Sequence, residues 1–271
     1  MTEITNLLAQ VRAKKPLVHH ITNYVTVNDC ANITLAIGAS PIMADDKDEV
    51  KEIVSISSAL VLNIGTLNER TIKSTMLAGE EANKKNVPVI FDPVGAGASR
   101  LRNETAAELI KKVRFAVVRG NMSEIRFLAG LSSGAKGVDV SEADKKEGLE
   151  GGIATAKELA LKLNTVVAIT GATDIISDGK KTYLVKNGFP EMESVSGTGC
   201  MCNSLVASFC GATGDFLRSA AAGIAAMCVA GEKAFSYTKE KGFGSFRVAL
   251  IDEISKLSPE TLSQAARIDE A

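Results

Sequence analysis

VSGTGCMCNS, residues 195–204, stands between a polar segment at 186–190 and a run of small, mostly apolar residues at 204–209. This order indicates a loop, a glycine turn and then a helix. Gly197 and Gly199 leave backbone N–H groups open to a ligand because neither residue has a Cβ atom. A helix that begins here adds free N–H groups and the positive end of its dipole, so the stretch predicts an anion site. Cys200 falls in the first turn of that helix, where the dipole is expected to lower the pKa of a thiol.

The same residues allow a second interpretation, in which they only cap a helix and Cys200 is a buried, inert thiol. A Gly-x-Gly pair alone is weak evidence, and Cys202 stands where a dinucleotide-binding fingerprint would have its third glycine. The chain contains no GxxxxGK[ST] sequence, so it is not a P-loop enzyme. The choice between an anion site and a simple helix cap therefore depends on residues elsewhere in the chain.

Composition excludes several classes of protein. The chain has 271 residues, of which 45% are hydrophobic, enough for a large α/β core. A net charge of −1 and an aromatic content of 4% without tryptophan predict no surface for nucleic acid and none for an anionic membrane. We expect no membrane span and no signal peptide. Five cysteines, an odd number without a CxxC pair, indicate reduced thiols in a cytoplasmic protein.

Apolar runs alternate with helical segments along most of the chain, a pattern that predicts parallel strands joined by helices. The predicted strands cover residues 17–21, 39–44, 59–66, 87–91, 115–120 and 165–171. The predicted helices cover residues 2–13, 28–37, 47–57, 68–83, 101–112, 153–163, 220–234 and 246–256, and others begin near 121 and 200. Residues 1–271 contain no repeat or linker, so we expect one α/β domain with helices on both faces of a mostly parallel sheet.

Three further segments complete the predicted layout. Residues 174–185 are expected to form a hairpin with a turn at Asp178-Gly179. Residues 131–152 are polar and contain several glycines, which predicts a long surface loop or lid. The tail after Pro259 is polar and is expected to be peripheral.

Two pairs of residues resemble metal ligands but have simpler interpretations. His19 and His20 lie on one predicted strand, where adjacent side chains point to opposite faces and cannot share an ion. We expect one of them to be buried and the other to lie at a pocket edge. Asp45 and Asp46 precede a predicted helix and are expected to cap it.

Polar residues follow the predicted strands at their carboxyl ends, where ligands bind in sheets of this kind. Asp92, Arg119 and Thr170 stand at three such ends, and Glu124 follows one of them closely. Carboxylate oxygens suit Mg²⁺, directly or through water, and arginine pairs with phosphate oxygens. Each residue alone also fits a turn or a helix cap. Together, opposite a glycine-rich anion site, they favour phosphoryl transfer.

The segments DPVGAG (92–97), NMSE (121–124) and GTGC (197–200) resemble the signature segments of ribokinase-like small-molecule kinases. With HITNYV (20–25), PIM (41–43) and VRGN (118–121) added, the set is most similar to the hydroxyethylthiazole kinase family of thiamine salvage. The resemblance runs in the same order from residue 17 to about residue 235. It implies a ribokinase-like three-layer fold and ATP-dependent phosphorylation of the hydroxyl group of 4-methyl-5-(2-hydroxyethyl)thiazole. It also implies a homotrimer with sites at the subunit interfaces.

The resemblance also implies roles for individual residues. Met43, Gly197 and Asn23 match substrate contacts, and Cys200 occupies the position of the general base. In the wider superfamily that position is usually Asp, within Gly-x-Gly-Asp. Cysteine departs from that pattern, although it resembles a form found within the thiazole kinases, and the departure bears on the strength of the base. Positioning and charge neutralisation supply most of phosphoryl transfer, which makes a weaker base tolerable.

The nucleotide end of the site is implied in the same way. Arg119 and Thr170 match ATP contacts, and Asp92 and Glu124 match the end that holds Mg²⁺ against the phosphates. Two other enzymes on this fold remain alternatives, a hydroxymethylpyrimidine kinase and a nucleotide-dependent NAD(P)H-hydrate dehydratase. Cys200 disfavours the dehydratase, for which we expect Asp at this position. A catalytically silent nucleotide-binding protein is a third alternative, disfavoured by the intact Asp92, Glu124 and Arg119.

Overall fold

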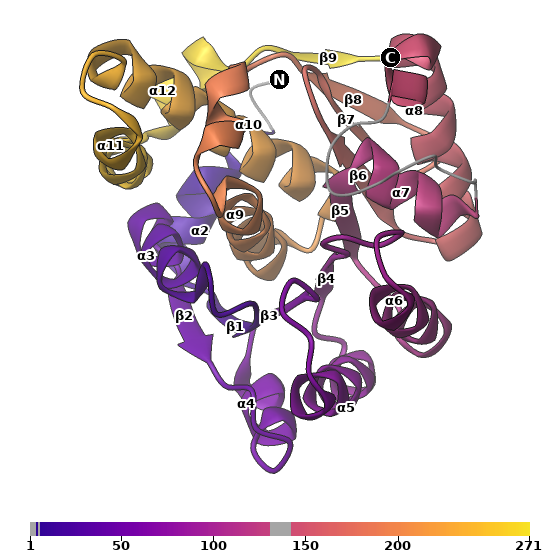
Figure 1. The fold of residues 1–271 in the computed structure, drawn as a ribbon. Helices are drawn as coiled ribbons and strands as arrows, with labels where there is room; N and C mark the ends of the chain where they lie inside the picture. Colours follow the sequence, from indigo (N-terminus) through magenta and orange to yellow (C-terminus); the bar gives the residue numbers. More distant parts are fainter. Residues whose placement is uncertain (1–3, 5, 131–141) are drawn as a thin grey trace.

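A nine-stranded sheet forms the centre of the protein, with strand order β2-β1-β3-β4-β5-β6-β7-β8-β9 (Figure 1). The computed structural model describes residue 4, residues 6–130 and residues 142–271, with side chains in the last range described from residue 148. Strands β1 to β6 run parallel, and β7 to β9 extend the sheet in antiparallel fashion. The strands are β1 (Leu17–Ile21), β2 (Ser40–Met43), β3 (Ala59–Asn63), β4 (Val89–Asp92), β5 (Val117–Asn121), β6 (Val166–Thr170), β7 (Asp174–Ser177), β8 (Thr182–Val185) and β9 (Ile268–Glu270).

Helices cover both faces of this sheet (Figure 1). One layer contains α2 (Leu7–Lys14), α3 (Val27–Ile37), α9 (Thr198–Thr213), α10 (Phe216–Thr238), α11 (Phe243–Lys256) and α12 (Pro259–Ala265). The other contains α4 (Val50–Ile56), α5 (Glu69–Lys85), α6 (Arg100–Lys112), α7 (Met122–Ala129) and α8 (Glu142–Leu163). The three layers confirm the predicted fold class.

Alternation along the strands explains the two layers. Successive side chains of a strand point to opposite faces of the sheet. On β3, Val61 packs in the α9 layer, whereas its neighbours Leu60 and Leu62 pack in the α5 layer. Because both faces are covered, every residue of this strand is buried. The run 59–62 is therefore continuously apolar, as expected for a parallel strand, and the polar Asn63 ends it.

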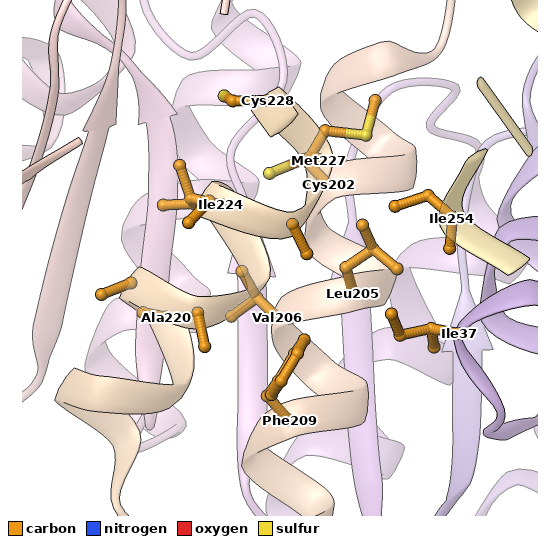
Figure 2. Close-up of a cluster of buried hydrophobic side chains, with 14 of the residues drawn as sticks. Ile37, Cys202, Leu205, Val206, Phe209, Ala220, Ile224, Met227, Cys228 and Ile254 are labelled. Atoms are coloured by element: carbon orange, nitrogen blue, oxygen red, sulfur yellow. The ribbon is translucent and has the colours of Figure 1, made fainter. Parts of the chain in front are cut away.

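Helices α9 and α10 form the centre of the larger core (Figure 2). Leu205, Val206 and Phe209 of α9 pack with Ile224 and other residues of α10 between the two helices and the sheet. The helices approach closely because α10 carries a glycine where they cross. A Cβ atom added at Gly223 would lie 2.8 Å from both the backbone nitrogen and the Cα atom of Val206. Small residues at this crossing thus set the position of α9, and with it the position of Cys200.

The order of the strands creates a switch point between β1 and β3. From β1 the chain moves outward to β2, and then returns to the other side of β1 for β3. Crevices that bind ligands form at such points, outside the carboxyl ends of the strands. The first turn of α9 approaches this edge, since Cys200 contacts residues that follow β1 and end β3.

Three predicted features of the layout are wrong. Residues 142–152 belong to α8, which has a non-helical break at Gly148, and do not form the predicted loop, while residues 131–141 of that loop lie outside the described residues. The tail after Pro259 is not peripheral, because it forms α12 and adds β9 to the sheet beside β8. Helix α4 begins at Val50, three residues later than predicted, and follows Glu49. Asp45 pairs with Arg70, whereas Asp46 Oδ1 accepts from the N–H of Asp48 at 2.9 Å and caps only the turn before the helix.

Both histidines are buried, so the expectation that one lies at a pocket edge is also wrong. His19 Nε2 lies 2.7 Å from the carbonyl oxygen of Ala44 on one face of the sheet. His20 lies 3.2 Å from Ser204 Oγ on the other, and burial lowers its pKa to about 3. Among the described residues, no group of three or more His, Cys, Asp or Glu is arranged to hold a metal ion. Within the same residues, no helix combines the length and apolar character needed to cross a membrane.

The crossing of α9 and α10 generates a prediction about stability. Gly223→Ala places a methyl group against the backbone of Val206, which cannot move without shifting α9, so we expect a loss of about 1–3 kcal/mol in the free energy of unfolding. Gly244→Ala, on α11 with open space around the added methyl group, is the matched control and should not destabilise the fold. Urea denaturation of both variants measures the difference. Equal stability of the two variants would show that the crossing tolerates a side chain.

Candidate active site

The turn before α9 brings two glycines into contact with neighbouring elements. Gly197 caps α9 with a φ of 93°, a left-handed conformation that favours glycine. A Cβ atom there would lie 2.7 Å from Thr26 Cγ2. A Cβ atom at Gly199 would lie 2.8 Å from Arg119 Nη1. The glycine turn (residues 196–199) therefore seats the start of α9 against the loop after β1 and against an arginine of β5.

Cys200 lies in the first turn of α9, half-buried, with two amide donors near its sulfur atom. The Nδ2 atoms of Asn23 and Asn63 lie 3.3 Å and 3.4 Å from Sγ. Burial raises the pKa of the thiol, and the carboxylate of Asp92 raises it further. The prediction of a lowered pKa is therefore wrong, and the free thiol is neutral near pH 7.

Asp92 ends β4 and is one of the most buried carboxyl groups of the described chain, with 2% of its surface exposed. The register of the sheet places it beside Asn63, the last residue of β3. Asn63 Nδ2 donates to Asp92 Oδ2 at 2.7 Å. Burial raises the pKa of this carboxyl, and the positive charge of Arg119 opposes the rise.

Glu124 lies in the first turn of α7 and is held by backbone N–H groups on both of its oxygens. Oε2 accepts from Asn121 at 2.9 Å, within a capping box, and Oε1 accepts from Gly95 in the loop after β4 at 2.8 Å. Burial and the nearby charge of Asp92 raise the pKa of Glu124 to about 7, although both N–H donors lower it. The buried Asp92 carboxylate thus disfavours ionisation of Glu124, a situation that a bound cation would relieve.

Arg119 and Thr170 meet across neighbouring strands. Arg119 Nη2 donates to Thr170 Oγ1 at 2.8 Å, and β5 and β6 are paired in register there. The same guanidinium lies under Gly199. Its Nε atom is buried and has no partner among the described residues. The positive charge of Arg119 therefore lies against the glycine turn.

Of the three predicted substrate residues, Asn23 contacts Cys200 directly. Asn23 is buried after β1, and its Oδ1 accepts from the backbone N–H groups of Val25 and Thr26, which leaves Nδ2 directed at Cys200. Gly197 caps the helix that carries Cys200. Met43 ends the edge strand β2, with 36% of its surface exposed, paired in register with His20.

Sequence reasoning missed Arg102, which organises the loops after β3 and β4. Its guanidinium donates to the carbonyl oxygens of Ile64, Gly65 and Val94 at 2.6–2.8 Å. Nothing in the local pattern distinguishes this arginine from other polar residues of α6. Its role depends on which loops the helix start faces.

Asp174 was also missed, because it was interpreted only as the start of a hairpin. Its Oδ1 accepts from the N–H of Gly171 at 3.0 Å, directly after Thr170, and its Oδ2 lies 3.5 Å from Cys228 Sγ. Burial raises its pKa to about 6. The carboxyl group therefore shapes the turn that carries Thr170.

A model of the hydroxyethylthiazole kinase family matches residues 8–260. The chain belongs to that family. A hydroxyethylthiazole kinase from Ruminiclostridium cellulolyticum is 56% identical over 268 residues, which cover 99% of this chain and 97% of the relative. Another from Clostridium tetani is 49% identical over 266 residues, which cover 98% and 97%. The solved structure of a hydroxyethylthiazole kinase from Pyrococcus horikoshii is 35% identical, with a TM-score of 0.90 and complete coverage of both chains.

More distant structures agree on the fold. A ribokinase-like superfamily protein from Enterococcus faecalis is 12% identical, with a TM-score of 0.66 and coverage of 94% of both chains. The predictions of a ribokinase-like fold and of a kinase of the hydroxyethylthiazole kinase family are confirmed. Membership favours this interpretation over a hydroxymethylpyrimidine kinase, a dehydratase or a silent binding protein.

The carboxyl pair generates a prediction about pH. The pKa of Glu124 is about 7 in the fold against a usual value of 4.5, so between these values the folded protein holds a proton that the unfolded chain has lost. The contribution of Glu124 to stability is therefore present at low pH and falls as pH rises through 7. Glu124→Gln, which cannot titrate, should cost more free energy of unfolding at pH 5 than at pH 8. Urea denaturation of both proteins without divalent cations tests this, and a cost that is equal or larger at pH 8 would contradict it.

Proposed function

We propose that this protein transfers the γ-phosphoryl group of ATP to the hydroxyl group of 4-methyl-5-(2-hydroxyethyl)thiazole. The observation that carries the proposal is Cys200, at the start of α9, within hydrogen-bonding distance of Asn23 and Asn63 and in the field of Asp92. The names of the relatives support the choice of acceptor. The hydroxyl oxygen attacks the γ-phosphorus, the bond from that phosphorus to the β-phosphate oxygen breaks, and ADP leaves.

Cys200 takes the proton of the attacking hydroxyl in this proposal. Its thiol is neutral at rest, so proton transfer to sulfur requires prior loss of the thiol proton to solvent or to a group in the site. Both nearby amides donate toward sulfur, which favours the thiolate once it forms. In a loose transition state the hydroxyl oxygen is only weakly bonded to phosphorus, so its proton is removed late and a weak base is sufficient.

Arg119 and Thr170 are proposed to bind the nucleotide phosphates together with the glycine turn. Arg119 already bonds to Thr170 and has a buried Nε atom without a partner in the described part of the chain. An arginine that is held by one bond and retains further N–H groups is suited to phosphate oxygens. The N–H groups at the start of α9 add a second donor set for the same anion.

Mg²⁺ is proposed to lie near Asp92 and Glu124, and the residues present fit it. Mg²⁺ usually binds through one or two carboxylates together with water and substrate phosphates. Two carboxyl groups are therefore sufficient, and the described residues contain no group of three or more His, Cys, Asp or Glu arranged for a metal. Both oxygens of Glu124 already accept N–H bonds, so water-mediated contact suits this residue and Asp92 is the candidate direct ligand. When bound, the ion neutralises charge that develops on the phosphates.

The acceptor is proposed to bind between Met43, Asn23 and Gly197, in a homotrimer whose subunit interfaces complete the sites. Exposed apolar side chains next to the buried Asn23 support this arrangement. Tyr24 is 78% exposed and Val25 is 59% exposed in the isolated chain. Large apolar side chains of this exposure mark an interaction surface when they gather beside a site.

The chain as a whole is proposed to act as one cytoplasmic domain. One continuous sheet includes strands from β1 near the N-terminus to β9 at the C-terminus, which supports a single unit over residues 1–271. All five cysteines are free thiols, as expected in a reducing compartment.

The acceptor can be tested directly. With ATP and Mg²⁺, release of ADP should be fastest with 4-methyl-5-(2-hydroxyethyl)thiazole, compared with hydroxymethylpyrimidine and ribose at equal concentrations. The measurement is a coupled assay of ADP in each case. Faster turnover of either competitor would overturn the proposed substrate.

The role of Cys200 is tested by two substitutions. Cys200→Ala removes the proton acceptor and should lower kcat by about 10²-fold, the low end for a general base, while the KM for ATP changes little. Cys200→Asp should remain active because a carboxylate accepts the same proton. If Cys200 only packs the start of α9, the Ala variant keeps its kcat and the buried Asp lowers the melting temperature. Steady-state kinetics and a thermal melt of both variants distinguish the two roles.

A further inference from the structure

Asn63 makes hydrogen bonds in four directions at the carboxyl end of β3. Its Nδ2 atom donates to Asp92 Oδ2 at 2.7 Å and to Cys200 Sγ at 3.4 Å. Its Oδ1 atom accepts from the N–H of Gly65 at 2.8 Å and from Asn23 Nδ2 at 3.1 Å. The two donor and two main acceptor positions of the amide are thus all in use, and the side chain is buried.

These partners fix the orientation of the amide. A flipped side chain would place Oδ1 against the carboxylate of Asp92 and Nδ2 against the N–H of Gly65, which loses both bonds and creates two repulsive contacts. The backbone is fixed as well, because Asn63 and Asp92 are paired in the register of β3 and β4. The single nitrogen Nδ2 therefore holds a constant position between the sulfur atom and the carboxylate.

We propose that Asn63 is a positioning residue, which sets the place of the Cys200 sulfur relative to Asp92 by donating one N–H bond to each. The inference rests on the proposed role of Cys200 as proton acceptor. Asn23 completes the arrangement, since its Nδ2 contacts both Asn63 Oδ1 and the same sulfur. Sulfur then has two amide donors that are hydrogen-bonded to each other, and loss of Asn63 removes one donor of the sulfur and one acceptor of Asn23 Nδ2.

Asn63→Ser tests the proposal in two backgrounds. The hydroxyl group is neutral but too short to reach both partners, so sulfur loses a fixed donor without gaining a charge. In the otherwise unchanged protein we expect kcat to fall about tenfold, with KM values for ATP and acceptor within about threefold. In the Cys200→Ala background the same substitution should lower kcat by less than about threefold, because residues that act through one another are not additive.

Asn83→Ser is the matched control. Asn83 also forms two hydrogen bonds through its amide, with the backbone of Arg114. It lies near the C-terminal end of α5, whereas Asn63 lies at the carboxyl end of β3. Asn83→Ser should leave kcat unchanged, whatever its effect on the melting temperature. If Asn63→Ser fails to fold, Asn63→Thr, which is also neutral, donates no amide bond and suits a strand, takes its place in the same comparison.

The outcomes separate this inference from the proposed function. A full kcat in Cys200→Ala alone removes the proposed base. A loss in Cys200→Ala together with an equal effect of Asn63→Ser in both backgrounds keeps the base and overturns the role of Asn63. A normal kcat in Asn63→Ser overturns that role as well, whatever its melting temperature.

Discussion

Burial of the Asp92 carboxyl group is the constraint on which the rest of the site depends. A carboxylate that leaves water without partners costs several kcal/mol, so the fold has to supply donors or a positive charge beside it. Strand pairing supplies Asn63 from β3, and Arg119 of β5 supplies the charge. Arg119 is in turn held by Thr170 of β6 and lies under Gly199 of the α9 turn. One buried acid therefore links residues of four neighbouring strands and one helix start, before any ligand binds.

Sequence patterns predicted the elements that carry this network better than the contacts between them. Apolar runs located every parallel strand, and glycines located the start of α9, because both signals are local. Asn63 was interpreted only as part of the apolar run 59–66, since its importance depends on β3 lying beside β4 in register with Asp92. Residues 142–152 were mistaken for loop because of their charges and glycines, although Glu, Lys and Leu are good helix formers. The tail was underestimated because β9 gains its stability from pairing with β8.

The state of Cys200 shows why position in a helix does not by itself determine a pKa. The first turn of α9 favours an anion, and that local fact predicted a lowered pKa. Burial and the neighbouring carboxylate act in the opposite direction and raise the pKa of the thiol. The dipole of a helix end contributes typically 0.3–1 kcal/mol at exposed sites, less than the loss of water around a charge. The sequence places Cys200 on the helix but gives no measure of its burial.

A neutral thiol at position 200 fits the charges around it. Asp92 already raises the pKa of Glu124, and a third carboxylate here would add another negative charge where phosphates are proposed to bind. Cysteine avoids that repulsion in the resting protein, and its sulfur lies beside two amide donors that stabilise an anion only when one forms. The arrangement exchanges strength as a base for a lower electrostatic cost of assembling the site. That exchange is tolerable in phosphoryl transfer, where positioned charges lower the barrier more than removal of a proton does.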